Sequence, residues 1–132
     1  MDIKDITSIF DKDEVSDLAD SLGMKDGESF VCLGVEYKLW LCPADPGSKP
    51  ECFWTMSTEI PEGIDIYITK DLPDDFKRAV LVHKIVESAA YPKIGDMFKS
   101  HLLAREYDTH YAESHFSLDR LEEFLRLDSG LV

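Results

Sequence analysis

The sequence has no long hydrophobic run. A membrane-spanning helix needs about 20 consecutive apolar residues, and no stretch of this chain approaches that length. The first five residues, MDIKD, also lack the apolar segment of a signal peptide. We therefore expect a cytoplasmic protein without a membrane partner. Its 132 residues, 44% of them hydrophobic, suit one globular domain spanning residues 1–132.

Basic residues are also few. The chain has 14 lysines and arginines against 27 aspartates and glutamates, which gives a net charge of -13. This balance argues against nucleic acid and against an anionic membrane surface as partners. Two interpretations stay open: a solvated acidic surface, or a non-enzymatic interaction domain of the inhibitor or immunity type that covers a basic protein.

Cysteine and glycine motifs are missing as well. The three cysteines, Cys32, Cys42 and Cys52, form no CxxC pair, so a disulfide framework or a zinc knuckle is not expected. The seven glycines form neither a phosphate-binding loop nor a G-x-S-x-G elbow. These absences exclude the commonest nucleotide-binding and serine-hydrolase signatures.

Hydrophobic periodicity predicts helices at the N-terminus and strands in the middle. Apolar residues recur at helical spacing at Ile3, Ile6, Phe10, Val15, Leu18, Ala19 and Leu22. Asp11 and Glu14 form the D-x-x-E pattern of a capping box, and Gly23 predicts the end of that helix. Strands of a small meander are expected at 29–33, 35–41, 52–57 and 64–69, with a proline-rich loop at 42–51.

Three further helices are expected in the last third of the chain. Pro73 should begin the first, which should run to about residue 91 and end at Pro92. Asp96 should cap a second helix that runs to residue 115, and Ser117 should cap a third. The fold predicted is α+β, with a small antiparallel or mixed sheet between N-terminal helices and a C-terminal helical part.

The helix expected at 74–91 carries a polar pair within an apolar run. His83 and Glu87 are four residues apart and therefore share one helix face. A buried carboxylate needs a cation, a metal ion or hydrogen-bond donors. His101, on the next expected helix, is a candidate third member, and such nitrogen and oxygen donors suit zinc. Alternatively, the pair only forms hydrogen bonds inside the core.

Two segments resemble zincin-like metallopeptidases. AVLVHKIVESA (79–89) resembles their H-E-x-x-H zinc helix, and more closely the relatives with glutamate at the last position. HLLAREYD (101–108) resembles the following segment, which supplies a third ligand; an alternative alignment uses REYDTHYA (105–112). The strand IDIYIT (64–69) resembles the family's edge strand along the substrate cleft.

The resemblance implies a zincin-like fold and a zinc-dependent peptidase or an inactive relative of one. It implies His83, Glu87 and His101 as ligands, with Glu106 or Asp108 competing for the third place. It also implies a peptide or protein substrate laid against the strand at 64–69. A ligand site would bring the three donor atoms together, whereas pairing of Glu87 with lysine or arginine would argue against one.

Lys84 departs from the family pattern. The family has a glutamate at this position, which is the general base that takes a proton from zinc-bound water. An ammonium group does not serve as that base at its usual pKa, and general-base help contributes about 10²–10⁴-fold in rate. Glu106 or Asp108 remain candidate replacements. We therefore expect a metal site whose peptidase activity is lost or altered.

Overall fold

A computed structural model describes residues 11–32, 35–43, 55–60 and 63–128. The elements follow the order α2 (Lys12–Ser21), β1 (Glu28–Cys32), β2 (Val35–Cys42), β3 (Thr55–Ile60), β4 (Gly63–Thr69), α3 (Asp74–Ile94), α4 (Met97–His115) and α5 (Leu118–Asp128). The predicted α+β class is confirmed. The helix expected around Ile3 to Phe10, most of the proline-rich loop and Cys52 lie outside the described residues. None of the described helices is both long and apolar enough to cross a membrane.

The sheet is mixed, with strand order β1-β2-β4-β3. β4 runs parallel to β2 and antiparallel to β3, so the predicted meander was wrong. The isoleucine-rich β4 takes a central position because Ile66 and Ile68 are then fully buried. Both of its edges are paired, so its backbone has no free edge for an added peptide strand. Residues 64–69 are therefore a central strand and not an edge strand, and the expectation that a substrate lies along an edge there was wrong.

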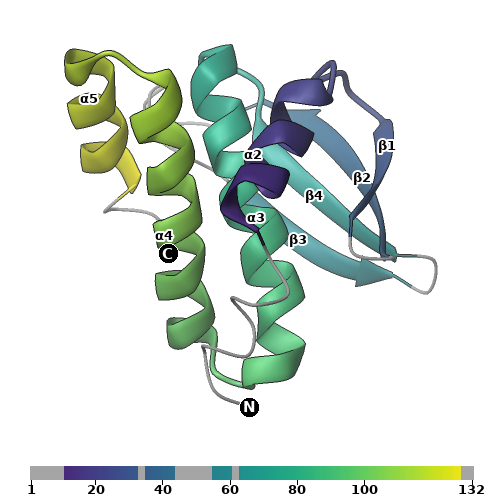
Figure 1. Ribbon diagram of the computed structural model, residues 1–132. Coiled ribbons are helices and arrows are strands. Elements are labelled where there is room, and N and C mark those ends of the chain that lie inside the picture. The colour runs from purple at the N-terminus through teal and green to yellow at the C-terminus, as the bar shows by residue number, and fades with distance from the viewer. Residues whose placement is uncertain (1–10, 33–34, 44–54, 61–62, 129–132) are drawn as a thin grey trace.

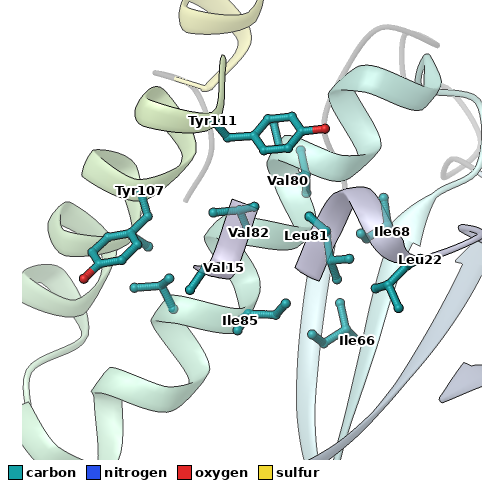
Figure 2. Packing of buried hydrophobic residues seen from close by; sticks show 14 of the residues in the cluster. Val15, Leu22, Ile66, Ile68, Val80, Leu81, Val82, Ile85, Tyr107 and Tyr111 are labelled. Carbon is teal, nitrogen blue, oxygen red and sulfur yellow. The ribbon is translucent and has the colours of Figure 1, made fainter. Parts of the chain in front are cut away.

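Helix α3 lies between the sheet and α4 (Figure 1), and this position explains its composition. Leu81 and Ile85 of α3 point toward Ile66 and Ile68 of the sheet (Figure 2). Every residue from Ala79 to Glu87 is buried. A helix that is buried on all sides is usually apolar on every face. Each polar side chain between residues 79 and 87 therefore needs a partner inside the protein.

The predicted N-cap of α2 and its predicted end before Gly23 are both confirmed. The Asp11 carboxylate accepts hydrogen bonds from the backbone N–H groups of Asp13 and Glu14, at 2.8 and 3.2 Å. The last helical residue is Ser21 and the C-cap is Leu22, and the carbonyls at this end are bonded by a distant residue. Arg78 of α3 donates from Nη1 to the carbonyl oxygens of Ala19 (2.6 Å) and Leu22 (2.7 Å).

Helix α3 continues past Pro92 to Ile94, so the predicted stop at Pro92 was also wrong. Pro92 lacks only one N–H donor within the last turn, and extending the helix packs Ile94 against the core. Gly95 then adopts a left-handed φ of 73° and closes the helix through its N–H, which donates to the carbonyl of Tyr91. The turn places α4 beside α3 (Figure 1).

The N-caps expected for the last two helices are confirmed. The Asp96 carboxylate accepts from the N–H of Lys99 at 3.0 Å and begins α4. The Ser117 hydroxyl accepts from the N–H of Arg120 at 3.4 Å at the start of α5. These local signals fix where α4 and α5 begin.

Candidate metal centre

Polar side chains of α3 and α4 meet at the interface between the two helices. His83 and Glu87 are one turn apart on α3, and His101 and Asp108 are two turns apart on α4, so each pair faces the other helix. His83 and Asp108 are fully buried, and Glu87 is 7% exposed. The structure therefore brings together His83, Glu87 and His101, the three residues that the sequence proposed as ligands.

Three donor atoms lie close to one another. Oε2 of Glu87 lies 3.2 Å from Nε2 of His83 and 3.2 Å from Nδ1 of His101. One ligand atom from each of the three residues lies within 4.8 Å of the others. Zinc bound tetrahedrally at about 2.0–2.1 Å separates its ligand atoms by roughly 3.3 Å. Both distances from Glu87 match the edge of such a tetrahedron.

The second nitrogen of His83 is held by Asp108. Its Nδ1 lies 2.8 Å from Oδ2 of Asp108, and the Thr109 hydroxyl donates to the other carboxylate oxygen at 3.3 Å. Metal-ligating histidines generally donate their other ring N–H to such a carboxylate, which fixes the tautomer and the ring orientation. Asp108, considered from the sequence as a ligand or a base, thus lies at the ring nitrogen that faces away from Glu87.

His83 lies between two carboxylates, and this position determines its charge. Burial by itself lowers the pKa of His83. The hydrogen bonds and negative charges of Asp108 and Glu87 outweigh burial and raise the pKa from 6.5 to about 9. Ionised carboxylates only accept hydrogen bonds, so His83 donates from both nitrogens when no metal is bound. Two cations, His83 and Lys84, then balance the two carboxylates.

Glu87 divides its two oxygens between different partners. Oε2 faces the histidines, while Oε1 accepts a hydrogen bond from Nζ of Lys84 at 3.1 Å. Burial raises the pKa of Glu87, but the hydrogen bond from His83 and the charge of Lys84 outweigh it and lower the pKa from 4.5 to about 2. The two outcomes that we expected to exclude each other, donor convergence and pairing with lysine, therefore occur together.

The other two histidines lie elsewhere and attach α2 to α4. His110 Nε2 lies 2.8 Å from Oδ1 of Asp13, and His115 Nε2 lies 2.6 Å from Oδ2 of Asp20. Glu106, the remaining candidate for the third ligand or the base, is exposed on α4. None of these side chains belongs to the His83, Glu87 and His101 group.

No protein-family model, curated protein or solved structure matches this chain. Within the site itself, the sequence did not reveal two contacts, Asp108 with His83 and Lys84 with Glu87. The three-residue spacing of Lys84 and Glu87 is a signal for their pairing, because such residues are neighbours on a helix. The contact between Asp108 and His83 depends on the tertiary docking of α4.

Proposed function

We propose that this chain is a zinc-binding, zincin-like domain with Nε2 of His83, Oε2 of Glu87 and Nδ1 of His101 as its protein ligands. The observation that carries the proposal is the position of Glu87 Oε2, 3.2 Å from both histidine nitrogens. Two imidazoles and one carboxylate form a donor set that suits zinc, and three protein ligands are typical of sites that keep a fourth position open.

The residues around the ligands support the same proposal. Asp108 orients His83 through Nδ1, and Lys84 holds the second oxygen of Glu87. Two of the three ligands therefore have a charged partner that fixes their direction, as is usual around metal-binding side chains. Zinc would take the place of the proton on Nε2 of His83, since a metal-bound imidazole is neutral.

Efficient peptide hydrolysis is not part of the proposal. Lys84 donates to Glu87 and, as an ammonium group, cannot accept a proton from water. Asp108 is engaged at the far nitrogen of His83, and Glu106 is exposed. Among the described residues no further carboxylate adjoins the three ligand atoms, so the usual general-base contribution of about 10²–10⁴-fold would be missing.

Zinc binding tests the proposal directly. Protein stripped with a chelator and then titrated with zinc should take up close to one ion per chain by elemental analysis, and its thermal unfolding midpoint should rise. His83→Ala and His101→Ala should each abolish the shift. His110→Ala is the matched control, because His110 lies on α4 but pairs with Asp13. Absence of zinc uptake, or an equal loss in His110→Ala, would refute the assignment.

A further inference from the structure

Lys84 has more hydrogen-bonding capacity than its described surroundings use. The residue is 5% exposed, and its ammonium group can donate three hydrogen bonds. One goes to Oε1 of Glu87. Among the described residues, no acceptor takes the other two. A buried ammonium group with unused donors is unfavourable, so this position favours an additional acceptor beside Glu87.

The charge of the metal-loaded site favours an anionic acceptor. With zinc bound, His83 is neutral, so the charges counted among the described site residues are those of Lys84, Glu87 and Asp108, beside the divalent ion. The positive charges then exceed the negative ones by a single unit. An excess charge in a buried site is costly, and one monoanion at the open coordination position would remove it.

Building on the proposed zinc site, we infer that its open position binds a carboxylate, with one oxygen on the metal and the other on Nζ of Lys84. The Glu87 carboxylate already contacts both the ligand atoms and Lys84: Oε2 faces the histidine nitrogens, and Oε1 lies 3.1 Å from Nζ of Lys84. Lys84 and the ligand cluster are therefore one carboxylate width apart. A second carboxylate can bridge them in the same way.

The burial of the site limits the size of this ligand. The side chains of His101, Glu87 and Lys84 are 16%, 9% and 7% exposed. Side chains this deeply buried offer little contact to the middle of an extended chain, so we limit the proposed ligand to one that presents a terminal carboxylate. The carboxylate therefore comes from a small organic acid or from the C-terminus of a peptide, and both sources offer the same group to the metal and to Lys84.

Cobalt(II) provides a test that separates this inference from the proposed function, because it binds to nitrogen and oxygen sites and its visible spectrum reports changes in its ligands. Acetate should change the spectrum of the cobalt-loaded protein and saturate. In Lys84→Gln, which keeps a donor to Glu87, and in Lys84→Met, acetate should bind about tenfold or more weakly. Lys77→Met, on the same helix two turns earlier, should behave as wild type.

The remaining arms identify the source of the carboxylate. A short peptide with a free C-terminus is compared with the same peptide carrying a C-terminal amide. A spectral change with the free peptide but not with the amidated one assigns the site to peptide termini. A change with acetate but with neither peptide assigns it to small acids. Three results overturn the inference but not the proposed metal site: cobalt binding without an acetate response, an equal acetate response in the Lys84 variants, and tighter binding of inorganic phosphate than of acetate. Failure to bind cobalt overturns both.

Discussion

Oδ2 of Asp108 lies 2.8 Å from Nδ1 of His83, and both side chains are fully shielded from solvent. This contact joins the middle of α4 to the middle of α3. Because it occupies Nδ1, only Nε2 of His83 is left to face Glu87 and His101. A residue of α4 thus sets the direction in which the first proposed ligand on α3 points.

Removing the charge of Asp108 should weaken zinc binding without abolishing it. Loss of the carboxylate partner of a metal-ligating histidine typically costs about 10–100-fold in metal affinity, and we expect Asp108→Asn to fall in that range. Competition with a chromophoric chelator measures the change. Asp20→Asn is the control, because Asp20 contacts His115 away from the site. An affinity equal to wild type would show that Asp108 does not orient His83.

The contributions of His83 and Glu87 to the stability of the metal-free protein should be greatest in weak acid. The pKa of His83 is raised from 6.5 to about 9, so its contribution to stability is complete below pH 6.5 and disappears as the pH rises through 9. The pKa of Glu87 is lowered from 4.5 to about 2, so its contribution is present above pH 4.5 and is lost as the pH falls toward 2. Both contributions are complete between pH 4.5 and 6.5.

Urea unfolding with a chelator present, at about pH 6 and about pH 9, measures the alkaline half of this dependence. For wild type we expect the free energy of unfolding to fall by on the order of 2 kcal/mol over that interval. His83→Gln removes the titrating group, so its decrease should be clearly smaller. Equal decreases in the two proteins would mean that His83 has an ordinary pKa in the folded state.

Replacing one member of the Lys84 and Glu87 pair should be worse than replacing both. Glu87→Leu leaves a buried lysine without its partner, and breaking a buried pair in this way costs about 3–5 kcal/mol. Adding Lys84→Met removes the unpaired lysine charge, so the double variant should recover part of that loss, while His83 and His101 still lack their contact with Glu87. Urea unfolding of metal-free protein tests this, and a double variant no more stable than Glu87→Leu would argue against the pair.

Arg78 should hold the end of α2 in place. Its guanidinium bonds the carbonyls of Ala19 and Leu22, and a hydrogen bond to a charged group contributes about 1.5–3 kcal/mol. Arg78→Met should therefore lower the free energy of unfolding by about 2 kcal/mol and speed amide hydrogen exchange in α2. Lys77→Met is the neighbouring control. Unchanged exchange in α2 would show that these bonds do not fasten the helix.

The sequence predicted those features of the fold that depend on neighbours along the chain. The caps at Asp11, Asp96 and Ser117 were predictable because each is a side chain that bonds backbone groups two or three residues away. The position of β3 outside β4, and the bonding of α2 by Arg78, involve segments far apart in the chain. No local pattern encodes such contacts, and both were missed.

For the candidate site too, the sequence predicted the residues related by helical spacing and missed those contacts that depend on helix docking. His83 and Glu87 are fixed relative to each other by helical spacing, and His101 followed from its face of α4. The nitrogen that Asp108 contacts depends on how α4 is rotated and shifted against α3, which the spacing does not determine. The net charge of -13 still predicts a class of partner, and no described contact bears on it.

The α3–α4 pair has a consequence for how the protein folds. Glu87 is 14 residues from His101, and His83 is 25 residues from Asp108, so every residue of the proposed site belongs to one helical hairpin. The three proposed ligands span 18 residues, whereas each β2–β4 pair joins residues 27 apart, so closing the hairpin costs only slightly less chain entropy. All three proposed zinc ligands therefore lie on this hairpin, and no strand of the sheet supplies one.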